Sequence, residues 1–221
     1  MSGQTASERE KVNANYITII HHIFKMDIAY VEKYEKSFWK LIEKSKEENE
    51  TAKEQVEELV ANLAIKSEDE LLAFEINLRK QLKVLNIPTM VELCTILSSK
   101  HRVEKDRVCF EKKPGLNGFL YFRCWLILQG KDIVEVALSD IEKLVDTDIN
   151  IESVKAEGLL RVAQDAFSND DEDETILKAA NKFDKRLNYD MVEVLPDDDV
   201  NYENLDKKYP VLVKTVVELG E

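Results

Sequence analysis

The sequence predicts an all-α fold in which several helices surround one buried central helix. Three observations predict this class. The 221 residues include only 6 glycines and 4 prolines, too few for the many turns of an all-β fold. Apolar residues make up 44% of the chain, enough for a sizeable core. Helix-start signals recur along the chain, and one nearly uninterrupted apolar segment lies near its middle.

The central helix is expected at about residues 118–129, within the segment LNGFLYFRCWLILQG. Phe119 and Phe122 recur at helical spacing, and other apolar residues cover almost the whole circumference. The segment has about half of the roughly 20 residues needed to span a membrane, so we expect it inside a protein core. Gly118 is a suitable start, and Gly130 is a suitable C-terminal cap. A buried strand is the competing interpretation because aromatic residues are enriched, but the length and the flanking glycines favour a helix.

The N-terminal part of the chain is predicted to be a helical extension of the main domain. Apolar residues recur every three or four positions between residues 16 and 34, as in an amphipathic helix. We expect residues 1–36 to form this extension and residues 37–221 to form the all-α domain. The extension either packs on its own domain or binds a second copy or a partner. The candidate interface residues are Tyr16, Ile20, Ile23, Phe24, Ile28 and Val31.

Further helices follow in order. Thr51 and Ser67 each precede a glutamate by three residues, and these capping boxes predict two helix starts. Pro88 ends the second of these helices and begins a third. Residues 98–117 are expected to be irregular, with a solvated basic loop at 100–113.

Beyond the central helix, the apolar pattern predicts shorter helices separated by acidic loops. The helices are expected at residues 133–138, 141–145, 151–167, 175–187 and 209–219, with acidic loops at 168–174 and 197–199.

Arg123 is the only charge in the central segment, and a buried guanidinium needs a partner. Either it reaches solvent at a cleft, where it binds an anion, or an acid from a later segment pairs with it. The candidate acids are Glu135, Asp140 and Glu157. Tyr121, Arg123, Trp125 and Gln129 form the candidate binding cluster, for a small anion or a partner's carboxylate.

The pattern Gly-Phe-x-Tyr-Phe-Arg-x-Trp-Leu-Ile-x-Gln-Gly at residues 118–130 resembles the signature of the bacterial family catalogued as domain of unknown function 4240. The similarity extends over about residues 37–213. It includes Phe38-Trp39, residues 134–140, residues 163–167 and Tyr209-Pro210. Lys112 and Lys113 stand where the family often carries small and acidic residues, so a site built from those acids does not carry over. The resemblance implies the fold and implies no activity.

Composition excludes several classes of function. The net charge of −13 repels a phosphate backbone, so we expect no nucleic-acid binding. Cys94, Cys109 and Cys124 lack the paired spacing of a disulfide framework or a zinc site, so no metal and no cofactor are expected. The polar N-terminus lacks an apolar signal core, and no segment is long enough to span a membrane. The sequence therefore predicts a cytoplasmic protein without membrane association.

The motifs point to binding more than to catalysis. Cys109 with His101 is the one nucleophile–base combination that the sequence suggests. We expect a non-catalytic protein-interaction protein, by analogy of the toxin-immunity or phage–host conflict type, which binds a protein partner or itself as a homodimer. One alternative is a small-molecule or anion-binding protein, or an enzyme, with a pocket around Arg123. The other is an acidic mimic of nucleic acid.

Overall fold

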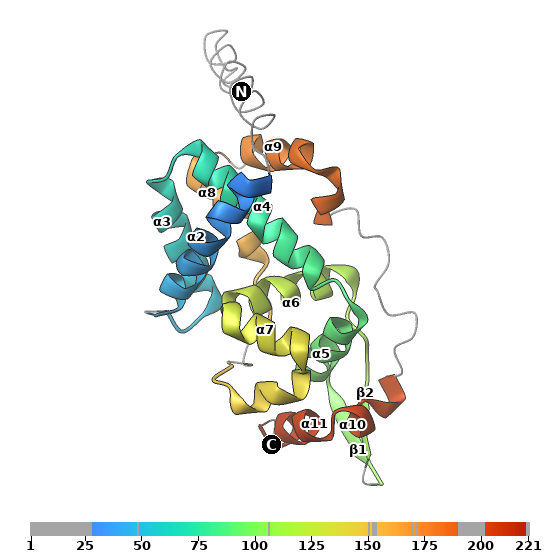
Figure 1. The fold of residues 1–221 in the computed structure, drawn as a ribbon. Coiled ribbons are helices and arrows are strands. Elements are labelled where there is room, and N and C mark those ends of the chain that lie inside the picture. The colour runs from blue at the N-terminus through green and yellow to red at the C-terminus, as the bar shows by residue number, and fades with distance from the viewer. Residues whose placement is uncertain are drawn as a thin grey trace.

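The computed structural model confirms the all-α class: helices surround a central helix, with one small two-stranded sheet (Figure 1). The structure describes residues 28–47, 49–105, 107–149, 151, 154–168, 170, 172–189 and 202–219, with side chains from residue 33 onward. The α-helices are α2 (Ile28–Glu47), α3 (Ala52–Ala64), α4 (Glu68–Val84), α5 (Pro88–Ser98), α6 (Leu116–Leu128), α7 (Lys131–Ser139), α8 (Val162–Phe167), α9 (Thr175–Phe183), α10 (Leu205–Lys208) and α11 (Pro210–Leu219). The strands are β1 (His101–Glu104) and β2 (Arg107–Phe110), and short 3₁₀ helices are η1 (Ile141–Asp146), η2 (Glu157–Arg161), η3 (Lys185–Leu187) and η5 (Tyr202–Asn204).

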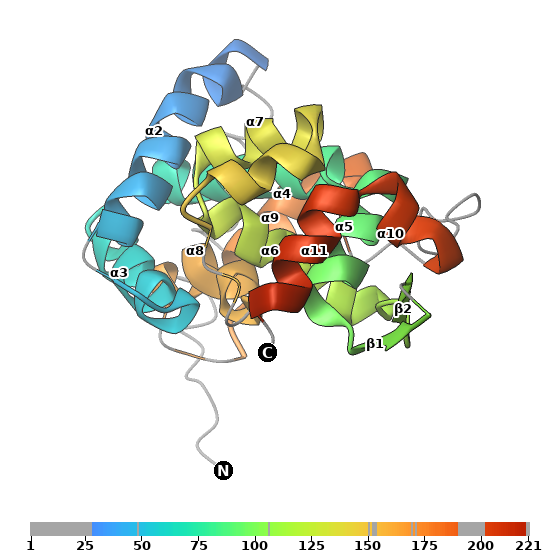
Figure 2. The ribbon, with the colours of Figure 1, turned by 90° about the horizontal axis from the view of Figure 1, so that it is seen from below.

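Helix α6 is the predicted central helix. It is buried on nearly every side, and Phe119, Phe122, Leu126 and Ile127 are at most 1% exposed. Figure 2 shows α2 and α3 on one side of α6 and α10 and α11 on the other. The helix begins at Leu116 rather than at the predicted Gly118. Within the described part of the chain, no helix is both long and apolar enough to cross a membrane.

Helices α2, α3 and α4 are the first three helices of the described chain, and they form one layer. The predicted capping boxes at Thr51 and Ser67 are both present, so α3 and α4 begin where the sequence indicates. Phe38 of α2 contacts Trp39 and Phe74, with ring centroids 5.0 and 4.9 Å apart. The first contact lies within α2, and the second, tilted contact joins α2 to α4 in the main core.

The segment predicted to be irregular contains a β-hairpin. Strands β1 and β2 pair antiparallel, with His101 opposite Phe110 and Arg102 opposite Cys109. The turn uses Lys105 at φ 47°, a left-handed conformation that closes a tight connection. The prediction of a loop was wrong because strands of four residues are too short to give a periodic signal.

The junction between α6 and α7 depends on Gly130, which confirms the predicted cap. Its φ of 98° disfavours any residue with a Cβ, and an added Cβ would collide with the Glu43 carboxylate. That carboxylate accepts a hydrogen bond of 2.9 Å from the backbone N–H of Lys131, in the first turn of α7. Glu43 therefore fastens α2 to this junction.

The prediction of one helix over residues 151–167 was wrong. Residues 154–156 are outside any helix, and Ala156 N–H donates to the carbonyl of Tyr121 over 3.1 Å. A short 3₁₀ helix, η2, then leads into α8. This hydrogen bond holds Ala156 against the side of α6, and it takes the place of a hydrogen bond within a helix.

The C-terminal elements are attached by buried polar groups. Arg79 of α4 donates to Glu75 (2.6 Å) and to Asn181 of α9 (2.5 Å). Glu92 of α5 is 3% exposed and accepts hydrogen bonds from Lys208 (2.7 Å) and Tyr209 (2.5 Å). Figure 1 shows α9 and α11 at opposite ends of the molecule, so the two attachments are separate.

Candidate functional site

The four predicted binding residues lie on α6 but do not face one hollow. Arg123, Trp125 and Gln129 are 2%, 2% and 6% exposed, while Tyr121 is half-buried. Because successive residues of a helix point about 100° apart, Tyr121 and Trp125 share a side that Arg123 does not. The structure therefore divides the predicted cluster.

Arg123 is a buried group that joins helices. Its Nη1 donates to the carbonyl oxygen of Leu82 over 2.7 Å, and its guanidinium lies 4.7 Å from the centre of the Phe119 ring. Leu82 is in the last turn of α4, where the free carbonyls carry partial negative charge. Burial lowers the pKa of Arg123 to about 10.

The predicted acidic partners of Arg123 have other partners, so that part of the prediction was wrong. Glu135 pairs with Lys131 at 3.5 Å, and Asp140 accepts a hydrogen bond from the backbone of Glu142. Glu157 accepts a hydrogen bond of 2.7 Å from the Tyr121 hydroxyl, which raises the pKa of Tyr121. The guanidinium instead contacts a carbonyl and an aromatic face, while its buried Nε has no hydrogen-bond partner among the described residues.

Trp125 of α6 and Gln129, its C-cap, lie one turn apart and line a hollow of about 500 Å³. We call it the α2–α3 hollow because seven of its eleven lining residues come from the end of α2, the following turn and the first turn of α3. Its lining residues are Lys46, Asn49, Glu50, Thr51, Ala52, Lys53, Gln55, Trp125, Gln129, Asp148 and Lys155. The volume falls in the range of small-ligand sites.

Local interactions hold the wall of the α2–α3 hollow in place. Lys46 Nζ donates to the backbone carbonyl of Gln129 over 3.0 Å, which joins the end of α2 to the end of α6. The capping box of Thr51 and Glu54 fixes the first turn of α3. Gln55, one turn into α3, is 5% exposed, and its Oε1 has no hydrogen-bond partner among the described residues.

The chemistry of the lining suits recognition of a polar group. Three lysines and two carboxylates give it a net charge of about +1, in a chain whose net charge is −13. Trp125 supplies an aromatic edge, and Asn49, Gln55 and Gln129 supply amides that both donate and accept. Histidine and cysteine are absent from the lining.

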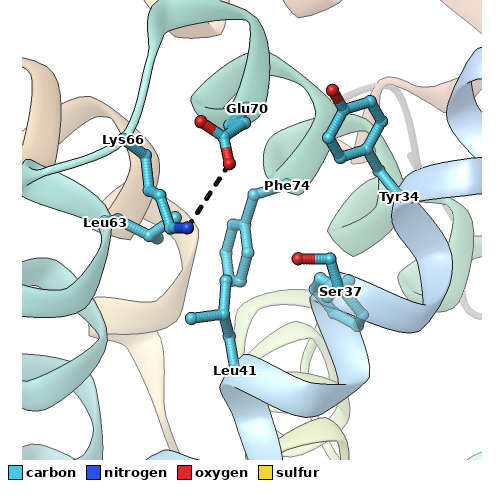
Figure 3. Close-up of a pocket in the computed structure, with 8 residues that line it drawn as sticks. Tyr34, Ser37, Leu41, Leu63, Lys66, Glu70 and Phe74 are labelled. Carbon is cyan, nitrogen blue, oxygen red and sulfur yellow. Dashed lines mark ion pairs between the residues drawn. The ribbon is translucent and has the colours of Figure 1, made fainter.

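A second hollow, between α2, α3 and α4, has a different character (Figure 3). Phe74, Leu41 and Leu63 surround it, and Lys66 pairs with Glu70 at 3.4 Å on its rim. Its volume of about 10 Å³ is no more than one water molecule requires. This hollow is a packing feature of the core.

The suggested Cys109–His101 combination is not formed. Cys109 is opposite Arg102 in the hairpin, whereas His101 is opposite Phe110 and lies against its ring, 6.3 Å between centroids. Neighbouring positions of a strand point to opposite faces, so the thiol and the imidazole face apart. Burial raises the pKa of the Cys94 thiol to about 12 and raises that of Cys124 as well. The described residues contain no group of three or more side chains placed to hold a metal ion.

The predicted interface residues fall largely outside the described chain. Tyr16, Ile20, Ile23 and Phe24 precede its first residue, and Ile28 and Val31 are described only as backbone of α2. Helix α2 runs through residue 36, where the extension was predicted to end.

Sequence reasoning identified Trp125 and Gln129 but missed the other wall of the hollow. The Thr51-x-x-Glu54 pattern located the start of α3, yet no local signal places that turn beside the end of α6. That proximity depends on how α2 packs, which is a tertiary property.

Comparison with known protein families places most of the chain in one family. A family model described as "Protein of unknown function (DUF4240)" matches residues 34–169, well over half of the chain. No curated protein and no solved structure matches the chain. The matched segment runs from α2 to the end of α8 and includes α6 and both walls of the α2–α3 hollow. The chain therefore belongs to this family of proteins of unknown function, DUF4240.

Proposed function

We propose that this protein is a non-catalytic binding protein and that the α2–α3 hollow holds an anchoring side chain of a protein partner. The carrying observation is the hollow itself: about 500 Å³, with an aromatic edge, three lysines and three amides around one opening. Partners are commonly anchored by one group that enters such a hollow while the surrounding surface excludes water. The lining suits an acidic or amide side chain because lysines and amides can donate to it.

The overall charge supports a basic partner surface around that anchor. A net charge of −13 attracts positive proteins and speeds their encounter. This combination fits a cytoplasmic protein that covers and neutralises a basic toxin, or a conflict protein of similar action. The absence of histidine and cysteine from the lining favours binding over nucleophilic or acid–base catalysis.

Site-specific photo-crosslinking tests the proposal, and the chain offers a closely matched control. Lys53, at the hollow, pairs with Glu57 at 3.8 Å, and the two side chains are 86% and 66% exposed. Lys214 on α11 pairs with Glu218 at 3.7 Å, with exposures of 75% and 64%. A photoreactive phenylalanine at position 53 should capture a discrete protein in cells, and one at position 214 should not.

Charge reversal completes the test. Lys53→Glu should reduce recovery of the captured protein about tenfold or more, measured with the unmodified chain as bait, while Lys214→Glu leaves it unchanged. Equal recovery from both variants would show that the hollow does not hold the partner.

The volume of the hollow favours a second candidate, a free small molecule with a carboxylate. Trp125 reports on this directly, since Trp39→Phe leaves it as the only tryptophan. A saturable change in its emission on titration with small carboxylates would support this candidate. If the emission is unchanged up to millimolar concentrations of the carboxylates, the small-molecule candidate is rejected, and a partner protein remains the proposed occupant.

A further inference from the structure

A separate hollow of about 310 Å³ lies where the end of α5, the chain leaving β2 and the first turn of α6 meet. We call it the basic hollow. Lys100, Lys112, Lys113 and Lys155 line it, and Glu111 is the one acidic residue of its lining. Its net charge is therefore about +3, in a chain of net charge −13. This local positive charge is opposite in sign to the net charge of the protein.

Three of these lysines lack a carboxylate partner. Lys100, Lys112 and Lys155 form no ion pair with any residue in the described ranges. Elsewhere, exposed lysines of this chain, such as Lys53 and Lys131, pair with a glutamate four residues later. Ammonium groups gathered around one hollow repel each other, and a bound anion would remove that repulsion.

Helix α6 contributes its N-terminus to the same hollow. Gly115 is its N-cap and makes no side-chain cap, and the first turn of the helix contains no acid. Phe119 is the first residue whose N–H bonds within the helix, to Gly115 at 2.9 Å. The preceding amides are therefore free to donate to an anion, which the helix dipole also favours.

The backbone beside this helix end is open. Gly115 and Gly118 both line the basic hollow, and a Cβ added to either would meet no atom within 4 Å. A ligand can therefore approach the helix backbone closely, as phosphate groups do in glycine-rich sites. The lysines and the amide donors are independent features that converge on one space.

We propose that the basic hollow binds a phosphate monoester. A phosphate dianion offers three acceptor oxygens, which match several lysines and backbone amides better than the two oxygens of a carboxylate do. The hollow holds the phosphate group and part of what it is attached to, and the remainder of the ligand extends into solvent. This site is distinct from the α2–α3 hollow and does not depend on the function proposed for it, although Lys155 lies between the two.

Titration of the full chain with inorganic phosphate, followed by amide NMR, tests the proposal. Saturable shifts are expected at Leu116, Asn117 and Gly118, and sodium chloride of equal ionic strength should not reproduce them. Lys112→Gln should weaken phosphate binding about fivefold or more, whereas Lys214→Gln should not. Shifts that are scattered over the surface, or equal in both variants, would mean that phosphate acts only as a screening ion and would overturn the proposal.

Gly118→Ala separates binding from folding. The added methyl meets no protein atom, and alanine is the better helix former, so melting temperature should be unchanged or higher. The methyl nevertheless occupies the approach to the free amides, so phosphate affinity should fall several-fold. Wild-type affinity in this variant would exclude the helix end as the site.

The source of the phosphate group is distinguished by comparing three probes. A phosphoserine peptide that binds at least tenfold more tightly than glycerol phosphate assigns the site to a modified protein, and the reverse order assigns it to a small phosphorylated molecule. A single-stranded oligonucleotide that binds more tightly than both, with steep salt dependence, would overturn the proposal in favour of a nucleic acid.

Discussion

Replacing Arg79 by methionine is predicted to cost about 3–5 kcal/mol of unfolding free energy, because it leaves a buried carboxylate without its guanidinium. Arg79 and Glu75 are 3% and 0% exposed as side chains, and Nε lies 2.6 Å from Oε1. The same guanidinium donates to Asn181 at 2.5 Å and to the carbonyl of Leu177 at 3.4 Å, and it lies 5.2 Å from the Tyr189 ring centre. One substitution therefore removes the ion pair and three contacts to the C-terminal part.

Urea unfolding followed by circular dichroism measures this cost, and two further variants isolate its cause. Arg186→Met removes a guanidinium that pairs with Asp184 but is 82% exposed, so it should cost far less than Arg79→Met. The double variant Glu75→Leu with Arg79→Met removes both buried charges, so it should recover much of the loss. A cost below 1 kcal/mol for Arg79→Met alone, with an unchanged urea dependence, would refute this reasoning.

Three further predictions concern other contacts. Gly130→Ala should cost about 2–3 kcal/mol, since alanine is strained at φ 98° and its methyl displaces the Glu43 carboxylate; a cost below 1 kcal/mol in urea unfolding would contradict this. Burial and the Glu92 carboxylate raise the pKa of Tyr209 to about 12. The neutral Tyr209 hydroxyl therefore contributes fully to the free energy of unfolding below about pH 10, and this contribution is lost as pH rises to about 12. Between about pH 10 and 12, the unfolding free energy of Tyr209→Phe should therefore fall by about 2–3 kcal/mol less than that of the wild type. Equal falls in the two proteins, measured by urea unfolding at each pH, would exclude this linkage. Ser67→Ala removes a capping box and should lower stability by about 1 kcal/mol, measured by thermal unfolding, where no change in melting temperature would count against the cap.

Local sequence patterns predicted the helices best. The capping boxes at Thr51 and Ser67, Pro88 and the Gly130 cap each depend on a few adjacent residues, and the structure confirms all four. The hairpin over residues 101–110 was missed because each strand has only four residues, too few for a periodic signal. The helix expected at 151–167 failed because apolar spacing does not reveal that Ala156 bonds to the backbone of α6.

The candidate site was predictable only in part, for the same physical reason. Trp125 and Gln129 were identified because they belong to the central motif, whose burial follows from its composition. The acids expected near Arg123 were wrong because the guanidinium contacts a carbonyl at the end of α4 and the Phe119 ring instead. Neither that partner nor the turn opposite Trp125 carries a local signal, since both are set by how helices pack.

The buried polar contacts of the C-terminal elements mean that the folding unit extends beyond the end of the family match. The match ends at residue 169, yet Gln164 accepts a hydrogen bond of 2.9 Å from the backbone of Ile176, and Glu92 holds Tyr209. A fragment ending at residue 169 would lack the partners of these groups and would uncover core residues that pack against Ile176, Leu205 and Leu212. It should not fold alone, but it should recruit a separately made fragment of residues 170–221. We therefore expect the chain to work as a split protein, whose two pieces report on each other's presence by assembling.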